Sequence, residues 1–174
     1  MATTISPQAL AQMRAAGAHF DLIDVRTPAE FEEVHIDFAK NIPLDRLDPP
    51  TILASRVSGS GPLYVICQSG MRAGQACKKL VETGLETINI EGGTAAWVAA
   101  GLPVVRGHRK VISLERQVRI TAGTLVATGT ALGYFVNPAW LALSGFVGLG
   151  LMFAGITDTC TMAMILSKMS WNQE

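Results

Sequence analysis

The sequence predicts an α/β domain with a central, mainly parallel sheet flanked by helices, followed by a C-terminal transmembrane helical hairpin. Short apolar strands alternate with helical segments through residues 1–107, a pattern typical of a parallel sheet. One of these strands, "LYVIC", is almost continuously apolar, as strands buried on both faces are. No charged residue occurs between Arg119 and Asp158, which indicates a membrane-embedded segment rather than a soluble one.

Composition divides the chain into a part typical of a soluble domain and a part typical of a membrane segment. Of the 174 residues, 49% are hydrophobic and only 16% charged, with no net charge. The absence of a basic excess argues against a nucleic-acid partner, and the start "MATTISPQAL" does not resemble a signal peptide. The predicted divisions are a catalytic domain at 1–107, a basic juxtamembrane linker at 108–118, membrane helices at 119–136 and 139–157, and a cytoplasmic tail at 158–174.

Helix-start signals order the first half of the domain. Ser6 followed by Pro7, and Thr27 followed by Pro28, are each a capping residue before a proline at the first helical position, so a helix is expected after each. A helix is also expected over 45–56, although Pro49-Pro50 interrupts it. The strands expected here are "HFDLIDVR", with Leu22, Ile23 and Val25 buried, and "AKNIPL".

The second half of the domain continues the alternation. The segment "SGSGP" is expected to be a flexible turn before the strand "LYVIC". A helix over "RAGQACKKLVETG", ended by Gly84, leads to the strand "ETINI" and then to a turn and short helix in "GGTAAWVAAG". The elements of this half therefore complete the expected parallel sheet.

Two long apolar runs follow the domain, at 120–136 and 139–156. About 17 residues is the lower limit for crossing a bilayer as a helix, and neither run has an amphipathic face. A buried helical pair in a soluble protein is the alternative. Five basic residues lie between Arg106 and Arg119, and Lys168 follows the second run, so the positive-inside rule places both ends in the cytoplasm.

Small residues recur along both runs at helical spacing. Gly129 and Gly133 form a GxxxG pair, and Ser144 and Gly148 form a similar pair of small residues in the second run. Such spacings allow helix backbones to approach closely. The pairs could pack the hairpin on itself or against a second copy, and both uses stay open.

Cys67 stands at the end of the strand "LYVIC", where ligands bind in parallel α/β sheets. The loop after it, Gln68-Ser69-Gly70-Met71-Arg72, enters the next helix. Backbone N–H groups of the turn and of the helix start can converge on one anion, and Arg72 adds a permanent positive charge. Each feature favours the thiolate over the thiol. We therefore expect Cys67 to be the nucleophile and this loop to bind the substrate; helix capping without chemistry is the alternative.

Other polar residues suggest supporting roles rather than a second centre. Asp24 and Arg26 end a strand at the same sheet edge as Cys67, where they could orient the loop by hydrogen bonds or form a structural ion pair. No histidine is placed to pair with Cys67, which suits sulfur transfer better than peptide hydrolysis. No metal-binding pattern includes Cys77 or Cys160, so no metal or organic cofactor is expected. The roles of these two cysteines stay open, with Cys77 either packing or resolving.

Three ordered motifs resemble the rhodanese family of sulfurtransferases. They are "CQSGMR", "LIDVRTPAEFEEVHIDFAKNIPL" and "EGGTAAWVAAGLPV". The resemblance implies that a donor such as thiosulfate gives its sulfur to Cys67 as a persulfide, which then passes to cyanide or a thiol. "LSGFVGLGLMFAGI" and "KMSWNQ" are similar to the bacterial inner-membrane rhodaneses. That similarity implies an inner-membrane, cytoplasm-facing homodimer joined through its membrane helices.

Three other functions remain as alternatives. The Cys-x4-Arg loop from Cys67 to Arg72 resembles that of the sulfurtransferases. The active-site loop of the related phosphatases is one residue longer, so phosphatase activity is the less favoured enzymatic hypothesis. The hairpin of a dimer could instead form a membrane path for a small sulfur-containing anion such as thiocyanate or sulfite. An exposed thiolate could also serve as a redox or nitrosation sensor.

Overall fold

The computed structural model describes residues 3–56, 61–107, 112–157 and 160–173. It divides into two compact units, one within residues 3–107 and one within 112–173. The first contains both strands and helices, and the elements described in the second are all helices. The helix that opens the second unit begins at Leu114, inside the segment assigned to the linker.

The first unit is built on a five-stranded sheet whose neighbouring strands are all parallel. In spatial order the strands are β1 (Thr3–Ile5), β6 (Thr87–Ile90), β5 (Leu63–Ile66), β2 (Leu22–Asp24) and β4 (Ala39–Asn41). All four residues of β5, the central strand, are buried. The predicted parallel sheet is confirmed. The edge strand β1 was not predicted from the sequence.

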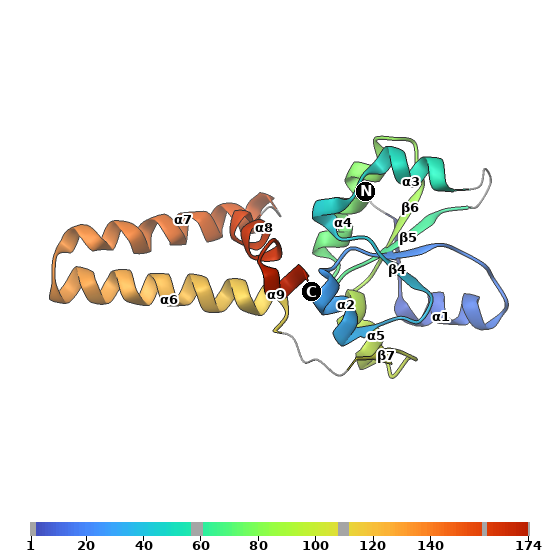
Figure 1. The fold of residues 1–174 in the computed structure, drawn as a ribbon, viewed down its shortest axis with the longest axis horizontal. Helices are drawn as coiled ribbons and strands as arrows, with labels where there is room; N and C mark the ends of the chain where they lie inside the picture. The colour runs from blue at the N-terminus through green and yellow to red at the C-terminus, as the bar shows by residue number, and fades with distance from the viewer. Residues whose placement is uncertain (1–2, 57–60, 108–111, 158–159, 174) are drawn as a thin grey trace. The chain divides into compact units, whose positions relative to one another are not determined.

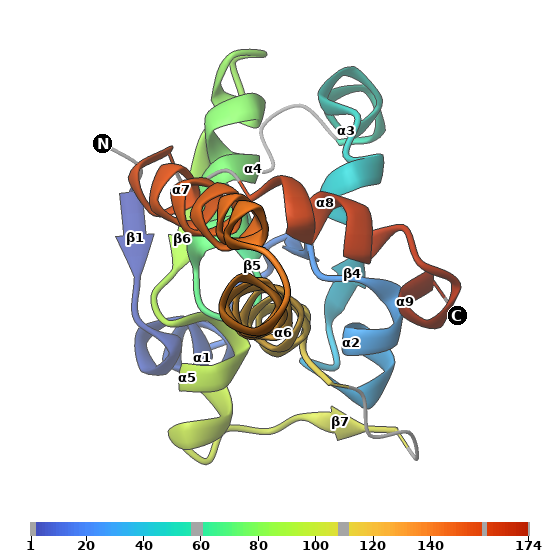
Figure 2. The same cartoon turned by 90° about the vertical axis from the view of Figure 1, so that its left-hand side faces the viewer.

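Helices cover both faces of this sheet. The helices of this unit are α1 (Pro7–Ala15), α2 (Pro28–Glu33), α3 (Pro49–Ser55), α4 (Met71–Val81) and α5 (Gly93–Ala99). Two short strands, β3 (Val34–His35) and β7 (Val105–Arg106), form a separate antiparallel pair. Figures 1 and 2 show α3 and α4 on one side of the sheet and α1 and α5 on the other.

Two hydrophobic clusters fill the spaces between the sheet and these helices. Alternate residues of a strand point to opposite faces, so β5 contributes to both. Leu63 and Val65 pack with Leu80 of α4, and Tyr64 packs with Leu10 of α1 and Trp97 of α5. Cys67 belongs to the α4 side, so its thiol lies where the core meets the carboxyl edge of the sheet.

Local capping explains where the helices begin. The Oγ of Ser6 accepts a hydrogen bond from Ala9 N at 3.2 Å, and Thr27 forms a capping box with Glu30, as the helix-start signals predicted. The prediction for 45–56 was wrong in detail. A 3-10 turn, η1 (Leu44–Arg46), precedes α3, and α3 begins at the prolines instead of being broken by them, because proline fits the first turn of a helix. The "SGSGP" turn falls largely outside the described residues.

The second unit contains a helical hairpin followed by two short helices. Its elements are α6 (Leu114–Phe135), η2 (Pro138–Trp140), α7 (Leu141–Thr157), α8 (Thr161–Ser167) and α9 (Ser170–Gln173). Figure 1 shows α6 and α7 side by side and antiparallel. Within the described residues, one stretch, Pro138–Thr157, is long and apolar enough to cross a membrane. A second span, expected on α6, remains a prediction.

Small residues bring α6 and α7 into close contact. A Cβ atom at Gly129 would lie 2.6 Å from Ser144 Oγ, and one at Gly133 would lie 2.7 Å from the side chain of Leu141. Ser144 Oγ donates a hydrogen bond to Val126 O at 2.9 Å. The GxxxG pair therefore packs the hairpin on itself, one of the two uses left open. At Gly148 a Cβ would meet no atom within 4 Å.

The C-terminal "WNQ" segment folds back onto the start of α6. Gln117 and Asn172 exchange hydrogen bonds between their side-chain amides, each 2.9 Å long. Trp171 Nε1 also donates to Gln117 Oε1 at 3.1 Å. These polar contacts close the end of the hairpin opposite the turn between α6 and α7.

Candidate functional site

The loop after β5 curls around the sulfur of Cys67. Gly70 has φ of +100°, a backbone conformation that glycine adopts readily. Its N–H donates to Cys67 Sγ, with 3.1 Å between the nitrogen and the sulfur. α4 begins at the next residue, Met71, and the N–H groups of a helix's first turn point out of the helix. Cys67 itself is buried, so its thiol lies at the base of this turn.

The start of α5 binds the loop from the other side. Thr94 N donates to Cys67 O at 2.8 Å, and Ala95 N donates to Gln68 O at 3.1 Å. Gly93 makes this approach possible, because its φ is +59° and a Cβ there would lie 2.1 Å from Cys67 O. Gly93 was not among the predicted site residues, although the "GG" pair was visible in the sequence.

Asn89 of β6 also holds the loop. Its side-chain Nδ2 donates to Gly70 O at 3.1 Å. Because β6 neighbours β5 in the sheet, this amide reaches the residue whose N–H contacts the sulfur. Nothing in the local sequence singled out Asn89, since the contact spans 19 positions.

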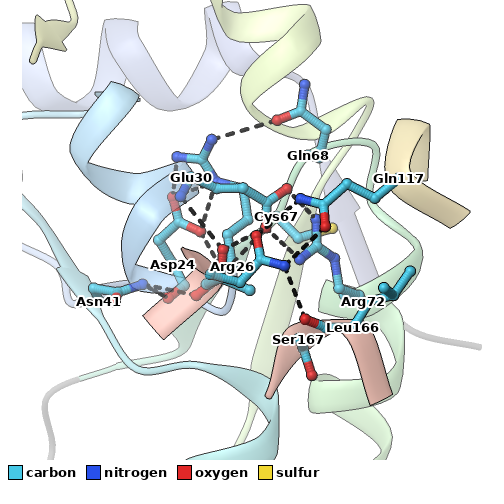
Figure 3. A network of polar contacts seen from close by, with 12 residues as sticks. Asp24, Arg26, Glu30, Asn41, Cys67, Gln68, Arg72, Gln117, Leu166 and Ser167 are labelled. Carbon is cyan, nitrogen blue, oxygen red and sulfur yellow. Dashed lines mark hydrogen bonds and ion pairs between the residues drawn. The ribbon is translucent and has the colours of Figure 1, made fainter. Parts of the chain in front are cut away.

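Asp24 and Arg26 form a buried ion pair, with each side chain only 1% exposed. Arg26 Nη2 lies 2.6 Å from Asp24 Oδ2, and Arg26 Nη1 donates to Gln68 Oε1 at 3.3 Å. Asn41 donates from Nδ2 to the backbone oxygens of both residues. The structure thus combines the two suggested roles, because the ion pair is structural and Arg26 also contacts the loop (Figure 3).

Arg72 binds the carboxylate of Glu30, a residue that was not among the predicted site residues. Its Nη1 lies 2.7 Å from Glu30 Oε2, and its Nη2 lies 2.9 Å from Glu30 Oε1. The side chains are 15% and 2% exposed, respectively. The charge expected from Arg72 is therefore compensated within the protein. The Thr-x-x-Glu capping pattern at Thr27 was the one signal that could have drawn attention to Glu30.

Glu30 is held in its charged form by its neighbours. Burial by itself would raise the pKa of Glu30, but the hydrogen bonds and charge of Arg72 outweigh it. Together with the charge of Arg26 and a backbone hydrogen bond from Thr27, they lower the pKa to about 2 from 4.5. A carboxylate with a lowered pKa stabilises the fold at neutral pH and loses that contribution in acid.

We expect acid to weaken the domain through Glu30. The contribution is fully present above about pH 4.5 and is lost as the pH falls towards about 2, and the shift corresponds to about 3 kcal/mol. Thermal unfolding of the detergent-solubilised chain between pH 6 and pH 2.5 would measure it. Part of the fall in Tm should be absent from Glu30→Gln. Identical pH dependence in both proteins would show that this ion pair contributes nothing.

The remaining predicted residues take different positions. Ser69 is exposed at the loop, and Met71 is 55% exposed at the first position of α4. Cys77 is buried in the same cluster as Cys67, and burial raises the pKa of the Cys77 thiol. Cys160 lies just before α8 and is partly exposed. Among the described residues, no group of three or more histidines, cysteines or acids could hold a metal ion.

Comparison with known families places the first unit. The sequence model of the rhodanese-like domain matches residues 6–100, more than half of the 174 residues. The chain belongs to the rhodanese-like family. The transmembrane domain of YgaP-like inner membrane proteins matches residues 111–174. This rhodanese therefore carries a C-terminal domain of the YgaP-like membrane type, as the motifs in its second unit predicted.

Relatives extend over different parts of this rhodanese. An uncharacterized protein of Synechocystis is 47% identical over 171 residues, which cover 98% of this chain and 93% of the relative. A protein of Allochromatium vinosum named as a sulfurtransferase is 33% identical over 106 residues, covering 60% of this chain and 96% of its own length. The similarity to the Synechocystis protein extends over both units. The similarity to the Allochromatium protein covers 106 residues, about the length of the rhodanese unit.

Solved structures confirm the rhodanese fold. A rhodanese-related protein from Thermoplasma volcanium superposes with a TM-score of 0.51 at 29% identity, covering 59% of this chain and 97% of that structure. A thiosulfate sulfurtransferase from Pseudomonas aeruginosa superposes with a TM-score of 0.52 at 27% identity, covering 62% of this chain and 20% of that structure. Together with the family match, these similarities support sulfurtransferase activity in general.

Proposed function

We propose that this protein is a membrane-anchored sulfurtransferase that carries sulfur as a persulfide on Cys67. The observation that carries the proposal is the N–H of Gly70, which points at Cys67 Sγ from a distance of 3.1 Å. This N–H donates to the atom that would act as the nucleophile in sulfur transfer. The family match to residues 6–100 supports the same reaction class.

The reaction has two balanced steps. The Cys67 thiolate attacks the outer sulfur of thiosulfate or a similar donor, a sulfur–sulfur bond forms, and the donor's own sulfur–sulfur bond breaks to release the rest of the donor, which is sulfite in the case of thiosulfate. Cyanide or a thiolate then attacks the outer sulfur of the persulfide, takes it as thiocyanate or a new persulfide, and restores the Cys67 thiolate. Neither step needs an external oxidant or a protonated leaving group.

Several residues of the loop contribute to binding the anionic donor. The N–H of Gly70 contacts the sulfur, and in this proposal it binds the anion together with the other backbone N–H groups from Gln68 to Arg72, as such turns can. Side chains outside the loop keep its shape, since Arg26 contacts Gln68 and Asn89 contacts Gly70. A preformed cradle costs no reorganisation when charge moves between donor and sulfur.

Mass spectrometry of the intact, detergent-solubilised protein tests the persulfide. Thiosulfate should add one sulfur atom to the wild type, and cyanide should remove it as thiocyanate. Cys67→Ser should lose both the adduct and the turnover. Cys77→Ser is the matched control, because Cys77 is the other cysteine of the same core cluster, and it should keep both. A folded wild-type protein with no adduct and no thiocyanate would overturn the proposal.

The membrane arrangement is proposed with the activity. We infer that α6 and α7 both span the bacterial inner membrane, with the catalytic unit and both termini in the cytoplasm, and that the protein is a homodimer through these helices. The apolar stretch Pro138–Thr157, the YgaP-like match and the five basic residues from Arg106 to Arg119 support it. The open position at Gly148 leaves α7 room for close approach by a second copy.

Single cysteines test this topology in intact cells. In a background without native cysteines, Asn137→Cys lies in the turn between α6 and α7, and Gln173→Cys lies in α9. A membrane-impermeant maleimide that has passed the outer membrane should label the first but reach the second only after lysis. Equal labelling of both positions would mean that the chain does not cross twice. The mass of the protein–detergent complex would report whether two copies associate.

A further inference from the structure

The segment at the start of α2 contacts both ends of the catalytic loop. Two of its side chains reach the loop: Arg26, just before the capping residue Thr27, and Glu30, in the first turn of the helix. Arg26 Nη1 donates to Gln68 Oε1 at 3.3 Å, next to Cys67. Glu30 binds Arg72 at the far end of the loop through both carboxylate oxygens (Figure 3).

Glu30 is itself firmly placed. Its Oε2 accepts hydrogen bonds from Thr27 N at 3.2 Å and from Thr27 Oγ1 at 3.1 Å. The same oxygen accepts from Arg72 at 2.7 Å. One carboxylate therefore both caps α2 and binds Arg72, and it is only 2% exposed. Such paired, charge-assisted contacts fix orientation as well as distance.

We propose that Glu30 is a positioning residue for sulfur transfer, which ties Arg72 in place and compensates its charge so that the loop binds anions mainly through its backbone. This inference rests on the proposed function. It assigns Arg72 to the framework of the loop, whereas the sequence suggested a direct electrostatic role. It also makes Glu30 a determinant of which donors the site prefers, because an uncompensated guanidinium beside the loop would favour donors of higher negative charge.

Two donors of different charge test this role in the full-length protein. Thiosulfate carries two negative charges and benzenethiosulfonate carries one, and both transfer sulfur to a thiolate. In Glu30→Gln, kcat with both donors should fall about tenfold or more because the loop loosens. The ratio of kcat/KM for thiosulfate to that for benzenethiosulfonate should rise about threefold or more, because the charge of Arg72 is no longer compensated.

Asp21→Asn is the matched control. Asp21 belongs to the same unit and pairs with Arg56 at 2.9 Å, so this variant also removes one carboxylate beside an arginine. Both kcat and the donor ratio should stay within about twofold of the wild type. Glu30→Asp keeps the charge but shortens the reach, so it should restore the donor ratio while kcat stays low.

The outcomes separate the possibilities. An equal loss of kcat/KM for both donors in Glu30→Gln would leave only a structural role and overturn the proposal, as would unchanged kinetics. If Glu30→Gln does not fold, the double variant Glu30→Gln, Arg72→Gln removes both charges, and its donor ratio should match the wild type. A raised ratio there would also overturn the proposal.

Failure of the proposed function is distinguishable from failure of this inference. If the wild type forms no persulfide, alkylation of Cys67 in the folded protein provides the readout in place of the donor ratio. The quantity measured is the rate with anionic iodoacetate divided by the rate with neutral iodoacetamide. Glu30→Gln should then raise the iodoacetate-to-iodoacetamide ratio about threefold or more, and Asp21→Asn should not. An unchanged ratio in Glu30→Gln would overturn the role of Glu30 independently of any turnover.

Discussion

Alanine at position 93 is expected to abolish sulfur transfer and to destabilise the catalytic unit. The added Cβ would lie 2.1 Å from Cys67 O and 2.8 Å from Gln68 O, and the φ of +59° is already unfavourable for alanine. Both clashes are with backbone, which cannot rotate away as a side chain can. The loop must shift or α5 must move, and the hydrogen bonds from Thr94 and Ala95 to the loop are then lost. We expect a cost of about 4 kcal/mol or more.

Thermal unfolding and thiocyanate production would measure this effect. Gly101→Ala is the matched control, since Gly101 has φ of +68° at the other end of α5 but a Cβ there would meet nothing within 4 Å. It should cost only the strain of the left-handed backbone, about 1–2 kcal/mol, and should keep its kcat. If Gly93→Ala behaves like Gly101→Ala, close approach to the loop is not what position 93 requires.

Removing Asp24 is expected to produce the second large effect. Asp24→Ala leaves the guanidinium of Arg26, only 1% exposed, without its carboxylate. An uncompensated buried charge typically costs about 3–5 kcal/mol, so Tm should fall markedly. Activity should fall further than stability alone requires, because Arg26 is also the residue that binds Gln68 in the loop.

Asp21→Ala provides the comparison for Asp24→Ala. Asp21 also pairs with an arginine, at 2.9 Å, but its side chain is 54% exposed. Surface ion pairs contribute about 0–1 kcal/mol, so Tm and kcat should change little. Equal losses of Tm and kcat in the two variants would mean that the buried Asp24–Arg26 pair contributes no more than an exposed ion pair. The measurements are thermal unfolding and steady-state kinetics on the same preparations.

Much of this architecture was predictable because its causes are local. The capping residues Ser6 and Thr27 mark helix starts through hydrogen bonds that span three positions. The apolar run "LYVIC" indicates a central buried strand because burial on both faces demands apolar side chains throughout. Cys67 could be predicted as the candidate nucleophile for the same reason, since a thiol between a buried strand and a helix is visible in the sequence alone.

The errors also have local explanations. At Pro49-Pro50 the sequence indicated an interruption, but the missing N–H groups cost nothing at a helix start, and α3 begins there. The edge strand β1 contains three residues, too few for a periodic pattern. In the second unit, the GxxxG spacing predicted close helix packing but not which helix is the partner. The close approach of Gly129 to Ser144 shows that the partner of α6 is α7, within the same hairpin.

The fold class, the order of the elements and the position of the thiol follow from the amino-acid sequence. The residues that surround the thiol are known only from the folded chain. Glu30 reaches Arg72 across 42 positions of the chain, and Gly93 meets Cys67 only because α5 begins beside the end of β5. Periodicity and capping report interactions between near neighbours. Contacts between distant residues depend on how the parallel strands are ordered in the sheet, and only the folded chain shows which side chains meet at its edge.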